Sequence, residues 1–307
     1  MSKTLKILFM CFSITILLVG CQKKGEETIN VADKETEPAI AVDNVISADG
    51  VSIAYETRGK GGPALVFIHG WCCDRSYWKE QVPYFAKKYE VVAIDLAGHG
   101  GSGLNRKEWT MEAFGKDVVA VVNKLGLEQV ILVGHSLGGP LILEAGSMMP
   151  KRVIGLIGVD TLNDFERKYS QEFIDKFSAG IRGNFVEYTN NFVRRMFTPN
   201  SNPMLIESIV ADMSSAPPEA GIGAVEALFD FVNNDMTQVL RELKMPITCI
   251  NSDRDPPNIM TNQRYAPSFK AKIMSGVGHF VMLEDPEIFN RLLDETIQEF
   301  LQMTESR

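Results

Sequence analysis

A glycine–serine turn between an apolar run and an apolar helical segment constrains the fold of this chain more than any other feature. Gly134-His135-Ser136-Leu137-Gly138 follows the run at 129–133 and precedes the segment at 137–149. In a G-x-S-x-G turn, the residues two before and two after the serine crowd each other, so both are glycine. The turn lifts the serine hydroxyl above the sheet edge, over a helix N-terminus that favours negative charge. The sequence therefore predicts a strand–turn–helix unit that presents Ser136.

The rest of the body alternates between short apolar runs and stretches with helical periodicity. Such alternation predicts an α/β fold with a mostly parallel central sheet and helices on both of its faces. Strands are expected at 45–47, 51–57, 64–68, 91–94, 129–133, 153–159, 247–251 and 270–273, and helices at 76–88, 111–125, 137–149 and 288–301.

The alternation breaks between residues 163 and 242. This segment is rich in Phe, Met and Asn, contains four prolines and shows no clear strand. It lies between two expected core strands, so we expect a helical cap inserted into the core. The body would then consist of a first core part at 44–162, the cap at 163–242 and a second core part at 243–307.

The N-terminus has the pattern of an export signal. A short basic region precedes an apolar stretch at 7–20, which is shorter than the ~20 residues that a membrane-spanning helix needs. The stretch ends in L-V-G-C, which resembles the lipobox of bacterial lipoproteins. That resemblance implies a signal peptide at 1–20, lipidation of Cys21 and a lipid-anchored protein of the bacterial cell envelope. The charged segment 21–43 is expected to be a disordered tether. An ordinary signal peptide with a chance cysteine is the alternative.

Composition narrows the choice of partners. The chain has 31 Lys and Arg against 39 Asp and Glu, a formal net charge of −8, and no basic cluster. Binding nucleic acid needs clustered cations, so we expect no nucleic-acid partner. We also expect no metal, because the sequence lacks H-E-x-x-H and paired C-x-x-C motifs. A G-x-G-x-x-G match at 98–103 has no helix opening directly on it, so no dinucleotide cofactor is expected.

A serine needs a base before it can act as a nucleophile, and the chain has only four histidines. His279 lies between the last expected strand and the last expected helix, from where an imidazole reaches back over the sheet. A carboxylate should orient that imidazole. Asp255, on the loop after the strand at 247–251, is the favoured candidate. Asp160, at the end of the preceding core strand, and Asp253 remain open as alternatives.

Acyl transfer also needs N–H groups that stabilise an oxyanion. The backbone of Leu137, directly after the serine, supplies one. The second should come from the loop after the strand at 64–68, where Trp71 follows His69-Gly70. We therefore expect the N–H groups of Leu137 and Trp71 to form the oxyanion hole.

Taken together, these motifs resemble the α/β-hydrolase-fold enzymes over residues 44–302. The resemblance implies a serine hydrolase similar to esterases and lipases that cleaves a small-molecule acyl substrate, without a cofactor. Epoxide hydrolases and dehalogenases of this fold use Asp where Ser136 stands, which argues against both. Thioester, lactone or C–C bond hydrolysis on the same triad, and a non-catalytic ligand-binding lipoprotein, are the alternatives. The resemblance rests on His69-Gly70-Trp71, the segment at 95–102, the turn at 134–139, and the chain order Ser136, Asp255, His279.

Overall fold

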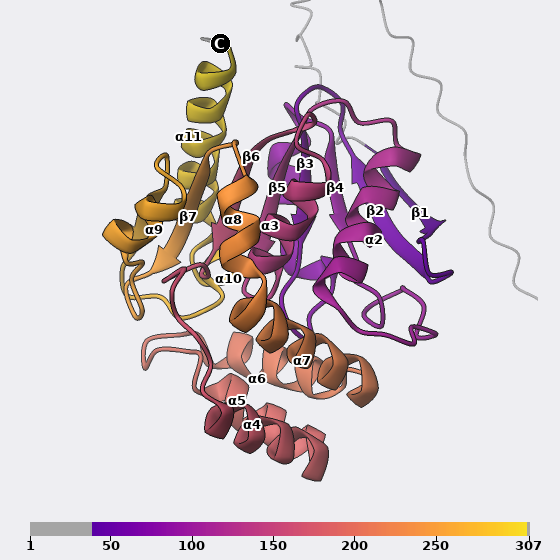
Figure 1. The fold of residues 1–307 in the computed structure, drawn as a ribbon, viewed down its shortest axis with the longest axis vertical. Coiled ribbons are helices and arrows are strands. Elements are labelled where there is room, and N and C mark those ends of the chain that lie inside the picture. Colours follow the sequence, from indigo (N-terminus) through magenta and orange to yellow (C-terminus); the bar gives the residue numbers. More distant parts are fainter. Residues whose placement is uncertain (1–38, 306–307) are drawn as a thin grey trace, which may run out of the picture. The chain divides into compact units, whose positions relative to one another are not determined.

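The computed structural model describes residues 39–305, and eight strands form the central sheet of this part. The strands are β1 (Ile40–Ile46), β2 (Ser52–Arg58), β3 (Ala64–Ile68), β4 (Val91–Ile94), β5 (Val130–His135), β6 (Val153–Val159), β7 (Ile247–Ser252) and β8 (Lys270–Met274). Their order across the sheet is β1-β2-β4-β3-β5-β6-β7-β8 (Figure 1). β2 runs antiparallel to β1 and β4, and all other neighbours are parallel. The predicted mostly parallel α/β sheet is confirmed.

The helices cover both faces of this sheet. On β6, Gly155 approaches Phe300 and Leu156 approaches Gly146. Successive strand residues point to opposite faces, so the helices that carry Phe300 and Gly146 lie on opposite sides. The helices are η1 (Arg75–Trp78), α1 (Val82–Phe85), α2 (Met111–Lys124), α3 (Gly138–Met148), α4 (Gln171–Gly183), α5 (Phe185–Arg194), α6 (Pro203–Ser214), α7 (Pro218–Asn234), α8 (Met236–Glu242), α9 (Ile259–Tyr265), α10 (Val281–Glu284) and α11 (Pro286–Glu305).

The helix expected at 76–88 is broken into two short pieces, η1 and α1. Pro83 stands in the first turn of α1. Proline lacks an N–H and is tolerated in a first turn but not in a helix interior, so the helix starts anew at Val82.

The N-terminal boundary of the sheet differs from the expectation. β1 begins at Ile40 and pairs with β2 along its whole length, so the last residues of the expected tether at 21–43 belong to the sheet. β1 pairs on one side only and all its residues are exposed except the partly buried Val45, as suits an edge strand. The expected signal peptide at 1–20 and the expected lipid site at Cys21 lie outside the described residues.

The segment between β6 and β7 folds into the five helices α4 to α8. Figure 1 shows α4, α5, α6 and α7 gathered beyond one end of the sheet, where they form the cap. The last helix of the segment, α8, packs instead against α3 on the face of the sheet. The cap therefore ends with α7 at Asn234, earlier than the expected residue 242.

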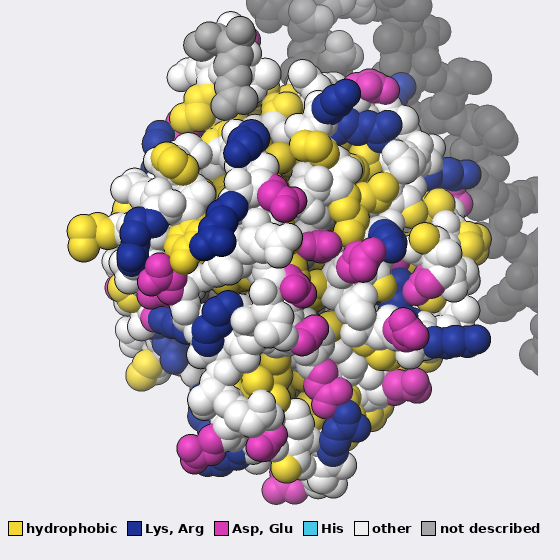
Figure 2. Space-filling model, viewed as in Figure 1, with side chains coloured by type: hydrophobic (Ala, Val, Ile, Leu, Met, Phe, Trp, Pro, Cys, Tyr) yellow, Lys and Arg dark blue, Asp and Glu magenta, His cyan; other side chains and the backbone are white. Residues whose placement is uncertain are grey.

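The surface is mixed in charge. On the face shown in Figure 2, acidic and basic side chains are interspersed. Between residues 39 and 305, no helix is both long enough and apolar enough to cross a membrane. The same part of the chain contains no group of three His, Cys, Asp or Glu side chains arranged to hold a metal ion.

Candidate active site

Ser136 occupies a strained turn between β5 and α3. Its φ is +53°, a value that residues other than glycine rarely adopt. A Cβ on Gly134 would lie 2.2 Å from the carbonyl oxygen of Gly138, so no larger residue fits there. The Ser136 N–H donates to the Val159 carbonyl (3.0 Å), and the Thr161 hydroxyl donates to the Ser136 carbonyl (2.8 Å). The predicted strand–turn–helix unit is present, and β6 with its following loop holds it in place.

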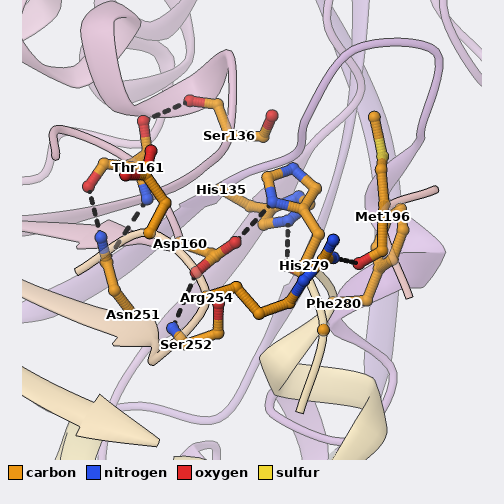
Figure 3. A network of polar contacts seen from close by, with 12 residues as sticks. His135, Ser136, Asp160, Thr161, Met196, Asn251, Ser252, Arg254, His279 and Phe280 are labelled. Atoms are coloured by element: carbon orange, nitrogen blue, oxygen red, sulfur yellow. Dashed lines mark hydrogen bonds and ion pairs between the residues drawn. The ribbon is translucent and has the colours of Figure 1, made fainter. Parts of the chain in front are cut away.

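His279 lies in the loop between β8 and α10, and its carboxylate partner is Asp160 (Figure 3). Nδ1 of His279 donates to Oδ2 of Asp160 across 2.6 Å, and the Ser252 N–H donates to the other carboxylate oxygen (2.7 Å). Burial raises the pKa of Asp160, but the hydrogen bonds and charge from His279 and the Ser252 contact outweigh burial and leave the pKa below its ordinary value. Asp160 is therefore ionised and holds the His279 ring with a proton on Nδ1.

The prediction that Asp255 partners His279 is wrong. Asp255 is exposed and receives two hydrogen bonds from the guanidinium of Arg167, at 2.5 and 3.1 Å. Because β6 and β7 are neighbours, the loops after both strands reach the same edge of the sheet. Asp160 follows β6 directly, whereas the turn after β7 directs Asp255 outward. Asp253, the other alternative, accepts from the Gly276 N–H (3.3 Å) and does not contact His279.

His135, inside the serine turn, is not a second base. Its Nε2 donates to the backbone carbonyl of His279 (3.0 Å), and the two rings lie 4.7 Å apart. Burial, with the neighbouring His279, lowers the pKa of His135 to about 3, so this imidazole is neutral. His135 therefore ties the nucleophile turn to the loop that carries His279.

The remaining histidines are structural. His69 Nδ1 donates to the Gly70 carbonyl (2.8 Å), while its Nε2 accepts from the Leu96 N–H (2.9 Å). His99 Nδ1 donates to the Ala97 carbonyl (2.9 Å). Burial lowers the pKa of both residues to about 4. Both therefore join the strand-end loops as neutral groups.

Ser136 and His279 border one cavity of about 210 Å³, which we call the aromatic cavity. In Figure 3, the Ser136 hydroxyl lies on the side of the His279 ring that faces away from Asp160. Nε2 of His279 is therefore on the serine side of the ring. Apart from these residues, the walls are predominantly aromatic and aliphatic, with Trp71, Cys73, His135, Leu137, Tyr169, Phe173, Phe177, Phe192, Met196, Met213, Val225, Leu228, Phe229 and Phe280.

A second cavity of about 220 Å³ meets the same two side chains, and we call it the polar cavity. It lies over the loop that follows β6. Besides Ser136 and His279, its walls are Leu137, Pro140, Asp160, Thr161, Leu162, Asn163, Asp164, Arg167, Tyr169, Leu228, Val232 and Met236.

The structure places Trp71 and Leu137 beside the serine, as the sequence predicts. A Cβ on Gly70 would lie 3.1 Å from the Ser136 Cβ, so the loop after β3 runs directly against the nucleophile. Within residues 39–305, the backbone N–H groups of Trp71 and Leu137 donate to no protein acceptor. Both groups are available to an oxyanion. The Trp71 indole donates to the Gly221 carbonyl in α7 (2.7 Å), which joins this loop to the cap.

The residues that fix the His279 loop are not predictable from the motifs of the sequence. The Glu284 carboxylate accepts from the N–H groups of Gly278 (3.0 Å) and Phe280 (3.3 Å), on either side of the histidine, and from the Ser201 hydroxyl. The His279 N–H donates to the Met196 carbonyl (2.9 Å). One available signal was an acidic residue five positions after the histidine, at the end of α10.

The Met196 carbonyl joins the cap to the core. It follows α5 and accepts from both the His279 N–H and the guanidinium of Arg254, whose other nitrogen donates to the Arg195 carbonyl (2.9 Å) (Figure 3). The end of α5, the loop after β7 and the His279 loop therefore share one hydrogen-bonded junction.

Comparisons with known proteins agree with this geometry. A family model described as the alpha/beta hydrolase fold matches residues 63–286. A 3-oxoadipate enol-lactonase 2 from Acinetobacter baylyi is 23% identical over 270 residues, covering 86% of this chain and 99% of that protein. Karrikin insensitive 2 receptor CA from Petunia hybrida is 23% identical over 245 residues, covering 75% of this chain and 90% of the receptor. The structure of a thermophilic esterase from Thermogutta terrifontis matches with a TM-score of 0.75 and 25% identity, covering 85% of this chain and 99% of the esterase.

Proposed function

This chain belongs to the α/β-hydrolase fold family, and we propose that it is a serine hydrolase that cleaves carboxylic esters through an acyl-enzyme on Ser136. The observation that carries the proposal is the 2.6 Å contact between His279 and Asp160, next to a cavity that His279 shares with Ser136. A base oriented by a buried carboxylate beside a strained serine is the arrangement that acyl transfer needs.

The proposed reaction begins when Nε2 of His279 takes the hydroxyl proton of Ser136. The serine oxygen attacks the ester carbonyl carbon, and the N–H groups of Trp71 and Leu137 stabilise the oxyanion. Collapse of this intermediate breaks the bond to the alcohol oxygen, which receives the proton from His279. A water molecule, deprotonated by His279, then attacks the acyl-enzyme; the bond to the serine oxygen breaks, the carboxylic acid leaves, and His279 returns its proton to Ser136. Asp160 stabilises the imidazolium in both halves of the reaction.

The decisive experiment uses the full-length chain in detergent with p-nitrophenyl esters of increasing acyl length. We expect turnover by the wild type and a loss of several orders of magnitude in kcat for Ser136→Ala. Ser268→Ala, at an exposed position before β8, is the matched control and should retain the wild-type rate. A fluorophosphonate probe should label the wild type and the control but not Ser136→Ala. Equal rates for Ser136→Ala and the wild type would refute the proposal.

The same assay tests two alternatives to ester hydrolysis. A lactone undergoes the same two-step chemistry, so a lactone panel run beside the esters identifies which acyl bond the site prefers. A non-catalytic ligand binder would hold a substrate without product release. The His279–Asp160 pair, on the same cavity as Ser136, favours turnover over binding alone.

We further propose that the chain is anchored to a membrane of the bacterial envelope through a lipid on Cys21. The support is the L-V-G-C sequence at the end of an apolar stretch that follows a basic region. Cells fed an alkyne-tagged fatty acid should incorporate the tag into the wild type and not into Cys21→Ala. Cys11→Ala, inside the expected signal peptide, should still be labelled. Tagging of Cys21→Ala would contradict the anchor.

A further inference from the structure

The aromatic and polar cavities meet at the catalytic pair. They share Ser136 and His279, while Tyr169 and Leu228 line both and stand between them. An ester bound at Ser136 therefore has room on two sides of its carbonyl carbon. The two cavities differ in chemistry: side chains with hydrogen-bonding groups line the polar cavity on the loop after β6, and aromatic rings line the aromatic cavity under the cap.

The protonation step decides which half of an ester enters which cavity. His279 gives its proton to the departing alcohol oxygen, so the alcohol lies on the histidine side of the carbonyl. His279 borders both cavities, but its partner Asp160 lines only the polar one, whereas Trp71, whose N–H is proposed to stabilise the oxyanion, lines only the aromatic one. The alcohol half therefore occupies the polar cavity, and the acyl half occupies the aromatic cavity.

The polar cavity presents unused donors and acceptors side by side. Asp164 accepts from the Glu166 N–H (2.9 Å) and from the Asn258 amide (3.1 Å), and a carboxylate offers about four acceptor positions. The Arg167 guanidinium has five N–H groups, and two of its bonds go to Asp255. An acceptor-only group next to a donor-only group matches hydroxyls, because each hydroxyl both donates and accepts.

Charge disfavours an anionic alcohol in this cavity. Asp160 and Asp164 line it, and Asp255 neutralises the guanidinium of Arg167 from outside. An anionic leaving group would meet two carboxylates without a free counter-charge. A neutral, hydroxylated group avoids this conflict and still meets the donors of Arg167 and the acceptors of Asp164.

On the basis of the proposed ester hydrolysis, we propose that the natural substrate is the ester of an apolar carboxylic acid with a neutral polyhydroxy alcohol. The acyl chain fills the aromatic cavity. Asp164 and Arg167 bind neighbouring hydroxyls of the alcohol and hold its ester oxygen next to His279.

The test compares two esters of 3-phenylpropanoic acid that differ only in the alcohol. The full-length chain should cleave the 2,3-dihydroxypropyl ester with a kcat/KM about tenfold above that of the n-propyl ester. In Asp164→Ala and Arg167→Leu, the ratio of the two kcat/KM values should fall from about tenfold to within about twofold. Asp230→Ala, an exposed carboxylate on α7 outside both cavities, is the matched control and should keep the preference.

Each outcome separates the substrate class from the proposed chemistry. Cleavage of both esters at equal rates by the wild type overturns the polyhydroxy assignment and leaves the serine mechanism standing. Preference for a choline ester of the same acid also overturns it, in favour of a cationic alcohol. If the wild type hydrolyses no ester, including the p-nitrophenyl esters, the proposed function itself is contradicted. The n-propyl rate of each variant reports whether its site is still folded.

Discussion

Nδ1 of His279 lies 2.6 Å from the carboxylate of Asp160, although 119 residues separate the two in the chain. The contact joins the end of β6 to the loop after β8, across the intervening strand β7. The strand between them takes part, because the Ser252 N–H at the end of β7 donates to the same carboxylate.

The choice of Asp160 over Asp255 predicts unequal effects of two matched substitutions. In Asp160→Asn, the amide donates to Nδ1 of His279, which leaves a proton on Nε2 and removes the base. We expect a fall in kcat of about 10³- to 10⁴-fold. Asp255→Asn should stay within about threefold of the wild type. Steady-state kinetics with a p-nitrophenyl ester checks both, and a larger loss in Asp255→Asn would reverse the assignment.

His135 is predicted to position the base through a single N–H. His135→Phe keeps a ring in the same place but removes the donor to the His279 carbonyl, so kcat should fall about tenfold while KM changes little. His135→Gln places an amide N–H near the position of Nε2 and should restore most of the rate. Equal kcat values for the two variants would mean that packing, and not the hydrogen bond, is what matters at this position.

Stability should fall on mild acidification because of buried neutral histidines. Burial holds the pKa values of His69 and His99 at about 4 and that of His135 at about 3. In the unfolded chain a histidine titrates near ~6.5. The unfolded state therefore gains protons that the folded state does not bind, and the free energy of unfolding decreases as pH falls from ~6.5 towards 4.

The expected loss is on the order of several kcal/mol over this interval. Urea unfolding at pH 7.5, 6.0, 5.0 and 4.5 measures it. His99→Asn, whose amide keeps a donor for the Ala97 carbonyl, should flatten the pH dependence by about a third. A free energy of unfolding that stays constant from pH 7.5 to 4.5 would rule out neutral burial.

A buried ion pair between α2 and the loop that precedes it contributes to the free energy of unfolding. The side chains of Arg106 and Asp117 are fully buried and joined at 2.7 Å. Arg106→Met leaves a buried carboxylate without its cation, and we expect a loss of about 3–5 kcal/mol. Arg182→Met, which breaks an exposed pair with Glu226, should cost less than ~1 kcal/mol. The double variant with Asp117→Leu should recover much of the loss, as measured by urea unfolding.

Those features of the fold and site that depend on residues close together in the sequence are predictable. The glycines at 134 and 138 and the apolar runs around them specify the serine turn, because both local sterics and burial act over a few residues. His279 is predictable because it is one of four histidines and stands before the last helix. Trp71 and Leu137 followed from their places after β3 and after the serine.

The acid was mispredicted because two adjacent loops compete for one position. β6 and β7 are hydrogen-bonded neighbours, so carboxylates after either strand reach the same histidine. The decision depends on the path of the loop after β7, where Arg167 and Asn163 hold Asp255 on the outside. Those partners lie some 90 residues away in sequence, beyond any local pattern. The role of Glu284 is unpredictable for a related reason: its carboxylate meets the N–H groups of Gly278 and Phe280 only in the folded His279 loop.

The junction at the Met196 carbonyl has a consequence for attempts to redesign this protein. Exchanging the cap for that of a relative is an obvious way to change which acyl groups are accepted. Here the end of α5 also provides the oxygen that receives the His279 N–H, so a transplanted cap replaces part of the support of the base. A chimera that keeps the backbone from Arg195 to Phe197 should stay active, whereas one joined inside that stretch should fold and yet turn over slowly.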